Sequence, residues 1–367
     1  MKPAVGMVLL LGIFISVPCL SAEPSFERSV IASHEDIPSN CYPCLARLEN
    51  GRLMIVWSGS GKEGSHIVGA FSEDHGKTWS QPIVLIKTPS GRDYDPSLVV
   101  SGPRVLVTCT TLPSAGGIRT STTWCTRSDD GANTWSPYYE IPMNHRYTCG
   151  KTHRGIRLKS GTLLMGYSWD VLCEKGQTLQ QEGEMHLRAG VMISTDNGAT
   201  WPNGGDTDAQ YEKVSAGAVR GTDEPAIVEL DDATIYMLMR TGSDRLYEAR
   251  SRDEGRTWTD IRPSPLTGSN APAALCKFVA DGRRGILCVW DNALSRFPLC
   301  AAASCDGGRT WTAPKDIAGP TGGRQASYPS CEQAADGTLV AVWQQDVDRG
   351  RDVRCARFSL AWLLEKP

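Results

Sequence analysis

The stretch SEDHGKTW, residues 72–79, decides the fold, because the chain repeats it. Four related stretches follow, SDDGANTW (128–135), STDNGATW (194–201), SRDEGRTW (251–258) and SCDGGRTW (304–311). Their shared pattern is Ser-x-Asp-x-Gly-x-Thr-Trp, although the second copy has its glycine one place early and Ala132 in the glycine position. A unit that recurs at this spacing predicts a repeat architecture.

Each copy is expected to form a structural turn. The Asp side chain can accept hydrogen bonds from nearby backbone N–H groups, and the Gly can adopt the positive φ that a tight turn requires. The Trp can then anchor the turn by burying a large apolar face on the strands behind it. The five aspartates are therefore interpreted as turn residues, and neither as catalytic groups nor as calcium ligands.

A second phrase precedes each turn and extends the pattern to six copies. Each copy is an apolar run, a polar turn that usually contains Gly or Asp, and a second apolar run, which predicts a β-hairpin. The copies span 42–57, 95–109, 153–169, 224–240, 271–290 and 328–343. With a third and a fourth strand in each unit, the chain is predicted to be all-β, a six-bladed β-propeller with five Asp-box turns. The strand at 28–33 is expected to complete the last blade and close the ring.

The N-terminus predicts export from the cytoplasm. Lys2, an apolar stretch and the small residues before Glu23 are typical of a secretory signal peptide at 1–22. Residues 23–367 would then form one propeller domain, secreted or periplasmic, with no membrane span.

The cysteine count agrees with an oxidising compartment. Thirteen are present, and the mature chain would keep an even number after loss of Cys19. The hairpins suggest three disulfides, Cys109–Cys125, Cys276–Cys288 and Cys331–Cys355. Cys41 and Cys44 have the spacing of a metal or redox motif, but no second such pair follows, so neither a metal nor a cofactor is expected. The net charge of −3, with scattered basic residues, argues against a nucleic-acid partner.

The innermost strands of a propeller bring distant residues together around one axis. The predicted ring is polar, ionisable and aromatic, as a sugar-binding pocket would be. Within it, Glu224 is placed to accept the proton of the Tyr328 phenol, which would activate that phenol as a nucleophile. Tyrosine nucleophiles are used by glycosidases that act on anionic sugars. Arg240 and Arg296 are predicted to bind the anion through bidentate hydrogen bonds.

Other ring residues are assigned supporting roles. Asp95 is a candidate catalytic acid, although it also fits a turn cap. His153 is a candidate proton shuttle or a hydrogen-bonded structural histidine. Substrate-binding roles are predicted for His153, Tyr42, Asn270 and Trp169, of which Tyr42 and Trp169 also fit the core.

The chain resembles the sialidase (neuraminidase) superfamily of Asp-box, or BNR-repeat, β-propellers over essentially its whole mature length. The resemblance is carried by the five boxes, Asp223-Glu224-Pro225, Arg240-Thr241, the stretch around Arg296 and Ser327-Tyr328-Pro329. In that family three arginines bind the substrate carboxylate, a Tyr/Glu pair supplies nucleophile and base, and an Asp is the acid/base. By motif, Glu224 and Tyr328 match the pair, and Arg240 and Arg296 match the second and third arginines.

The N-terminal half departs from the family pattern. The family's first arginine lies in an Arg-Ile-Pro motif, where this chain has Asn40-Cys41-Tyr42-Pro43. The loop in which the family carries its acid/base Asp is residues 58–66 here, and it contains no Asp. Glu63, His66 and Asp95 are the candidate replacements.

Three functions therefore remain open. The first is a secreted hydrolase of the exo-α-sialidase type that acts on a terminal acidic sugar of a glycan. The second is a uronate polysaccharide lyase on the same propeller, which would use His153 or a tyrosine to remove a proton. The third is a glycan-binding propeller without catalysis, which the missing arginine and acid would permit.

Overall fold

The computed structural model describes residues 23–113, 121–143, 145, 148–149, 153–170, 187–207, 221–268, 270–320 and 323–365. The predicted signal peptide lies outside these residues. Strands dominate, and a short helix, α3 (Leu360–Leu364), follows the last of them. Within the described ranges, no helix is both long and apolar enough to cross a membrane.

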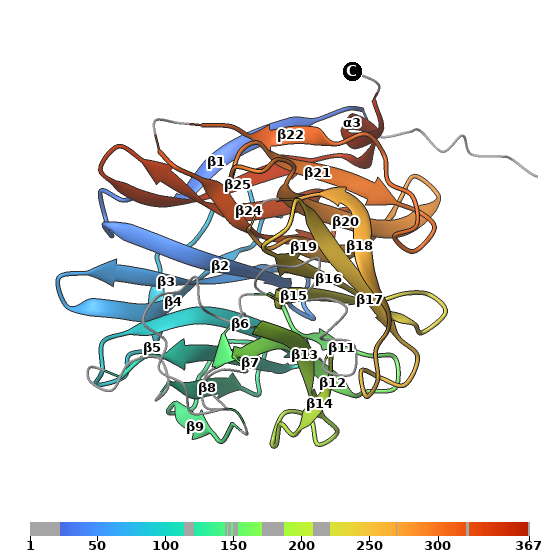
Figure 1. Cartoon of the computed structure of the whole chain (residues 1–367). Helices are drawn as coiled ribbons and strands as arrows, with labels where there is room; N and C mark the ends of the chain where they lie inside the picture. Colours follow the sequence, from blue (N-terminus) through green and yellow to red (C-terminus); the bar gives the residue numbers. More distant parts are fainter. Residues whose placement is uncertain are drawn as a thin grey trace, which may run out of the picture.

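Consecutive groups of antiparallel strands follow one another along the chain (Figure 1). In the N-terminal half the strands are β2 (Ser39–Arg47), β3 (Leu53–Gly61), β4 (Gly64–Ser72), β5 (Ile83–Ile86), β6 (Asp93–Ser101), β7 (Arg104–Thr111), β8 (Thr122–Ser128) and β9 (Tyr139–Ile141). The next group is β10 (Thr148–Cys149), β11 (Ile156–Arg157), β12 (Leu163–Asp170), β13 (Leu187–Ser194) and β14 (Asn203–Asp206).

The C-terminal half repeats the arrangement. Its strands are β15 (Thr222–Glu229), β16 (Ile235–Thr241), β17 (Arg245–Ser251), β18 (Thr259–Thr267), β19 (Ala274–Ala280), β20 (Arg283–Asp291), β21 (Leu299–Ser304), β22 (Lys315–Ala318), β23 (Ala326–Gln333), β24 (Leu339–Val347) and β25 (Gly350–Phe358). The N-terminal strand β1 (Phe26–Ala32) pairs antiparallel with β25, as the sequence predicts for the strand that closes the ring.

The prediction of six separate blades is met only in part. Hydrogen bonds join the described strands into five sheets, one of eight strands, one of five and three of four. The eight-stranded sheet contains β23–β24–β25 with β1, and also β2–β3–β4–β5. Its two halves meet through a parallel pairing of β2 with β25 at Ser39 and Arg351. The fold is thus all-β and propeller-like.

The first strands of the groups surround a common axis. Going round the ring, β2 contacts β6, β6 contacts β11, β11 contacts β15, β15 contacts β19, β19 contacts β23, and β23 contacts β2. Residues far apart in the sequence, such as Tyr42 and Tyr328, therefore become neighbours, since both lie on first strands.

The core lies between neighbouring sheets. On β24, Leu339, Ala341 and Trp343 pack into one apolar cluster, while the alternate residues Val340 and Val342 pack into another. Successive side chains of a strand point to opposite faces. A second strand is therefore covered on both faces, which explains its nearly continuous apolar sequence.

The five repeated turns form the same hydrogen-bonded structure. In the first copy, Asp74 accepts hydrogen bonds from the Thr78 backbone N–H at 2.9 Å, the Thr78 hydroxyl at 2.7 Å and the Ser72 hydroxyl at 2.8 Å. The same three contacts recur at Asp130, Asp196, Asp253 and Asp306. In the second copy, Ala132 adopts the glycine conformation, with φ 68°. The aspartates thus stabilise the turns through these hydrogen bonds.

The three predicted disulfides are wrong. None of the ten cysteines whose side chains are described forms a disulfide. In each predicted hairpin pair the cysteines are offset by one residue: Cys125 lies opposite Thr108, and Cys288 opposite Leu275. This offset places the two thiols of a pair on opposite faces of the sheet. In the third pair, strand β24 lies between the strands that carry Cys331 and Cys355.

Candidate active site

Four first strands carry the same distortion near their start. Tyr42, Asp95, Glu224 and Tyr328 each have a positive φ, of 56°, 50°, 41° and 55°. The pairing with the second strand shifts at each of them, between Cys41 and Cys44, Tyr94 and Ser97, Asp223 and Ala226, and Ser327 and Ser330. The chain therefore repeats one bulge at four positions around the axis.

The sequence explains the bulges. Proline follows each of the four residues, and proline has no N–H with which to continue the ladder. A positive φ at a residue other than Gly costs about 1–3 kcal/mol and is concentrated at functional sites. A bulge also re-aims a side chain away from the regular alternation of a strand. The four strained residues are two phenols and two carboxylates, which suits an acid–base site.

Arg240, at the end of β16, contacts both Glu224 and Tyr328, the carboxylate and the phenol that are predicted to act together. Its Nη1 donates a hydrogen bond to Oε2 of Glu224 at 2.8 Å and another to Oη of Tyr328 at 3.3 Å. Its Nε donates to Oδ1 of Asn270 at 2.7 Å. Arg240 is 4% exposed, Glu224 7% and Tyr328 9%, so these polar groups meet away from bulk water.

Two further residues enclose the Tyr328 ring. Tyr42 meets it edge-on, with the ring centroids 4.8 Å apart and the planes at 80°. The guanidinium of Arg296 lies over the ring, 5.4 Å from its centroid. Arg296 is held by Gln325 Oε1, at 2.7 Å from Nη1, and by the carbonyl of Asn270, at 2.9 Å from Nη2. The phenol thus lies between one aromatic edge and two cations.

Burial and charge set the protonation of the site. Burial raises the pKa of Glu224 to about 7, against the opposing effect of Arg240 and with help from the charges of Asp223 and Asp95. Burial, and then the charge of Glu224, raise the pKa of Tyr328 above its usual value, while Arg240 and Arg296 act to lower it. The phenol is therefore neutral in the free site, and Glu224 changes protonation state near neutral pH.

Asp95 belongs to the same electrostatic group. When it is ionised, its carboxylate raises the pKa of Tyr42, Glu224 and Tyr328. Asp95 shares its bulge with these three residues, so it holds the same position at the start of its first strand. Asp95 is thus one of the charged groups that act on the Tyr328 phenol.

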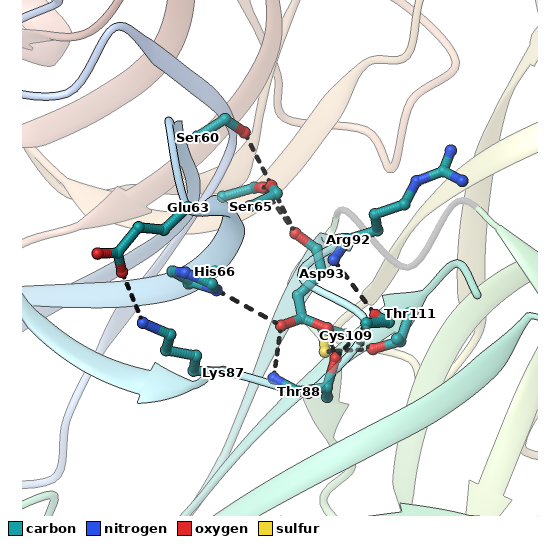
Figure 2. Close-up of polar contacts among 12 residues, drawn as sticks. Ser60, Glu63, Ser65, His66, Lys87, Thr88, Arg92, Asp93, Cys109 and Thr111 are labelled. Atoms are coloured by element: carbon teal, nitrogen blue, oxygen red, sulfur yellow. Dashed lines mark hydrogen bonds and ion pairs between the residues drawn. The ribbon is translucent and has the colours of Figure 1, made fainter. Parts of the chain in front are cut away.

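Glu63, one of the candidates for the acid/base residue, lies in the loop at 58–66. Its carboxylate is exposed and pairs with Lys87 at 2.9 Å, as Figure 2 shows. His66 instead faces the buried carboxylate of Asp93, with Nδ1 4.0 Å from Oδ2 (Figure 2). The Asp93 carboxylate also accepts hydrogen bonds from Thr88 and Thr111. Of the three replacement candidates, only Asp95 shares the bulge geometry of Glu224 and Tyr328.

His153 and Trp169 are both buried, and for Trp169 this agrees with the core position that the sequence also allowed. His153 is 5% exposed, and burial lowers its pKa to about 4, so it is a neutral, enclosed side chain near the backbone of Glu224. Trp169 stacks on His145, with centroids 4.0 Å apart, and donates its indole N–H to Asp206. These contacts of Trp169 lie outside the Tyr328 group, because β12 directs the indole into its own sheet.

Three residues that hold the site escaped the sequence prediction of site residues. Gln325 positions Arg296, and Gln344 Oε1 accepts the Tyr42 N–H at 3.0 Å. Asp223 accepts the backbone N–H of Glu224 at 2.8 Å and the Ser168 hydroxyl. For Gln325 and Gln344 the only signal was their position beside a first or second strand, whereas Asp223 belongs to the Asp223-Glu224-Pro225 motif. Among the side chains that the structure describes, no three His, Cys, Asp or Glu residues are grouped as a metal site requires.

Sequence comparisons relate the chain to known proteins. A sequence model described as the BNR repeat-like domain matches residues 51–341. A sialidase from Clostridium perfringens is 26% identical over 220 residues, which are 54% of this chain and 53% of that protein. An anhydrosialidase from Macrobdella decora is 36% identical over 74 residues, 20% of this chain and 9% of that protein. The chain thus spans about half the length of the first relative and less of the second.

Solved structures share the fold. The intramolecular trans-sialidase from Ruminococcus gnavus has a TM-score of 0.72 at 14% identity, covering 92% of this chain and 98% of that one. A protein of unknown function from Dyadobacter fermentans has a TM-score of 0.72 at 18% identity, covering 91% and 98%. Trypanosoma rangeli sialidase has a TM-score of 0.71 at 14% identity, covering 92% and 60%. At these identities the likeness shows a shared propeller-like fold.

Proposed function

Because the chain belongs to the BNR repeat-like domain family, within the sialidase superfamily of β-propellers, we propose that it is a glycoside hydrolase that removes a terminal acidic sugar from a glycan. The observation that carries the proposal is the contact of one Arg240 nitrogen with both Glu224 and Tyr328. A phenol, a carboxylate titrating near neutrality and two arginines meet at one buried point.

In the first step, the Tyr328 phenol oxygen attacks the anomeric carbon while its proton moves to the Glu224 carboxylate. The bond between the anomeric carbon and the glycosidic oxygen breaks, and the Asp95 carboxyl group donates a proton to the leaving oxygen. A neutral phenol suits an anionic sugar, since a carboxylate nucleophile would repel it. The raised pKa of Tyr328 means that deprotonation accompanies the attack.

In the second step, water attacks the anomeric carbon of the tyrosyl–sugar intermediate. Asp95, now ionised, accepts a proton from the water, and the phenol regains its proton from Glu224. Two displacements at one carbon retain its configuration. Product analysis by NMR during turnover is expected to show the retained anomer first.

Arg240 and Arg296 are assigned to the carboxylate of the sugar. Among the described residues, Nη2 of Arg240 has no hydrogen-bond partner, whereas Nη1 and Nε are occupied. Arg296 is fixed by Gln325 and Asn270, which leaves its guanidinium face over Tyr328. Guanidinium groups bind carboxylates in a bidentate manner and remain charged at all relevant pH values.

The test is turnover of a fluorogenic sialoside by the purified protein. Tyr328→Phe is expected to abolish hydrolysis while the melting temperature stays within a few degrees of wild type. Tyr138→Phe is the matched control, because that phenol lies on the outer edge and donates to the carbonyl of Lys87. A folded protein that hydrolyses no acidic glycoside would refute the proposal.

The other two functions receive less support from the geometry. A lyase would need a base for the sugar proton, and burial lowers the pKa of His153 to about 4, which makes its imidazole a weak base. A non-catalytic glycan-binding site would not require a strained backbone at both Glu224 and Tyr328. Binding of sialosides without any product would nevertheless select the binding function.

We also propose a blade count and a location for the domain. Counting the two halves of the eight-stranded sheet as separate blades gives the six-bladed propeller predicted from the sequence. Residues 1–22 are proposed to direct export, with the mature domain at 23–367. N-terminal sequencing of protein from the culture medium or periplasm is expected to begin at Glu23.

A further inference from the structure

A polar cavity lies beside the candidate active site and shares a residue with it. Its volume is about 710 Å³, within the range of about 300–1,000 Å³ of ligand-binding sites. Arg296, which covers the Tyr328 ring, forms one wall, and Arg324 and Arg351 line it further. A ligand that extends past Arg296 from Tyr328 would therefore enter a space with three guanidinium groups.

The arginines are held in different ways. Arg351 is fixed, because Nε donates to Asp346 Oδ1 at 2.6 Å and Nη1 donates to the Cys41 thiol at 3.0 Å. Arg296 is fixed by Gln325. Arg324 is exposed at the rim. Two guanidinium groups are thus pre-positioned, and the third is accessible to a ligand.

The charge of the cavity indicates what it binds. Asp346 and Asp348 also line it, so three positive and two negative side chains face the space. Asp346 is neutralised by its ion pair with Arg351, and Asp348 is exposed on the turn between β24 and β25. Arg351 is paired with Asp346, and Arg296 is assigned to the carboxylate of the first sugar. Arg324 is therefore the guanidinium that remains for a second anion, which suits one carboxylate rather than a densely charged group.

The lining also argues against a neutral sugar as the occupant. Among the described residues that line the cavity there is no aromatic side chain on which a sugar face could stack. Arginine is the side chain best suited to bidentate recognition of a carboxylate.

We propose that this cavity is a second anion-binding subsite, which holds a carboxylate on the sugar next to the one bound at Tyr328. The substrate class is then an acidic oligosaccharide with charges on two neighbouring residues. The inference rests on the proposed function for the order of the two sugars, whereas the anion site itself can be tested by binding alone.

The test compares two probes by isothermal titration calorimetry, with Tyr328→Phe as the parent so that neither probe is consumed. One probe is disialic acid, two directly joined sialic acids with two carboxylates, and the other is sialyllactose, which has one carboxylate and a neutral extension. The parent is expected to bind disialic acid about tenfold more tightly, the contribution of one charge-assisted contact. The preference should weaken at high salt.

Two arginine variants test whether the preference for disialic acid depends on the cavity. Adding Arg324→Gln is expected to remove most of the tenfold preference and to leave the affinity for sialyllactose unchanged. Adding Arg349→Gln removes the same charge from a nearby exposed position that does not line the cavity, and should keep the preference. Equal affinities for the two probes, no binding of either, or equal losses in both variants would overturn the subsite. Failure of the hydrolase proposal has a different signature, namely no turnover by the wild-type protein while the binding preference persists.

Discussion

Nη1 of Arg240 lies 2.8 Å from Oε2 of Glu224, and the same nitrogen lies 3.3 Å from the Tyr328 hydroxyl. One guanidinium nitrogen therefore bridges the base and the nucleophile in the free protein. We infer that the bridge must loosen before the phenol gives its proton to Glu224. A substrate carboxylate that binds Arg240 would loosen it, so binding and activation are coupled through this arginine.

Replacing Arg240, which bridges Glu224 and Tyr328, should impair catalysis more than folding. Arg240→Lys keeps the charge but has one nitrogen, which cannot hold Glu224, Tyr328 and Asn270 together. Loss of buried charged hydrogen bonds of about 1.5–3 kcal/mol each predicts a fall in kcat/KM of about 100-fold. Steady-state kinetics on a fluorogenic sialoside measure this. Arg245→Lys, at an exposed position on β17, is the control; a similar fall there, or none at Arg240, would refute the coupling.

The pH dependence should report Glu224. The carboxylate must be ionised to accept the phenol proton, so kcat/KM is expected to rise with pH around the pKa of about 7. The charge of Asp223 contributes to that raised pKa. Asp223→Asn, which keeps the oxygen that accepts the Glu224 N–H, is expected to move the rising limb to lower pH. A limb that stays in place would show that another group controls it, and Asp232→Asn, on a distant turn, should leave it unchanged.

The sequence predicts the fold better than the site because the same strand and turn patterns recur along the chain. The five turns and six hairpins recur with the same residue types, so each copy supports the others. The bulge residues could be predicted from the proline that follows each of them. Gln325 and Gln344 could not, because a glutamine that holds Arg296 or a backbone N–H has no distinctive sequence pattern.

A buried acid near the site should reduce stability at neutral pH. Asp291 is 2% exposed, and among the described residues neither of its carboxylate oxygens has a hydrogen-bond partner. Burial raises its pKa well above the usual value, although Arg296 opposes the shift. For an acid with a raised folded pKa, stability is retained below the unfolded value of about 4 and is lost as the pH rises through the folded value.

Asp291→Asn removes the ionisable group and is expected to raise the free energy of unfolding at pH 7. The gain should shrink toward zero near about pH 3, where the acid is protonated in both states. Denaturant unfolding at the two pH values measures the difference. Asp336→Asn, on an exposed turn, is the control. Equal gains at both pH values would contradict the assignment of the raised pKa.

The contribution of the Asp-box turns to stability should depend on pH in the opposite direction to that of Asp291. Desolvation raises the pKa of Asp74, but the hydrogen bonds from Thr78 and Ser72 together outweigh it and lower the pKa to about 2. Its contribution is present above the unfolded value of about 4 and is lost as the pH falls through about 2. Asp74→Ala is expected to destabilise the protein by about 1–2 kcal/mol at pH 7, a discounted figure because the group is solvent-exposed. Glu73→Ala, with only an exposed ion pair to Arg52, should change unfolding much less. Equal losses would show that the turn hydrogen bonds do not matter.

The cysteines show where sequence reasoning stops. Cys109 and Cys125 lie on adjacent strands, so their spacing fits a hairpin disulfide. The register shifts them by one residue, and a shift of one residue exchanges the faces of a strand. Cys41 likewise looked like part of a metal motif, whereas its thiol accepts a hydrogen bond from Arg351. Register and contacts of this kind depend on the assembled sheets.

The most direct test of the central claim, that Tyr328 is the nucleophile, is covalent trapping. Trypanosoma rangeli sialidase forms a covalent intermediate with 2,3-difluorosialic acid. After incubation with this reagent, mass spectrometry of the digested protein is expected to show one added fluorosugar on the peptide that contains Tyr328. The adduct should be absent from Tyr328→Phe and reduced in Glu224→Gln. An adduct on Glu224 or Asp95, or a folded and substrate-binding protein that acquires no adduct, would contradict the mechanism.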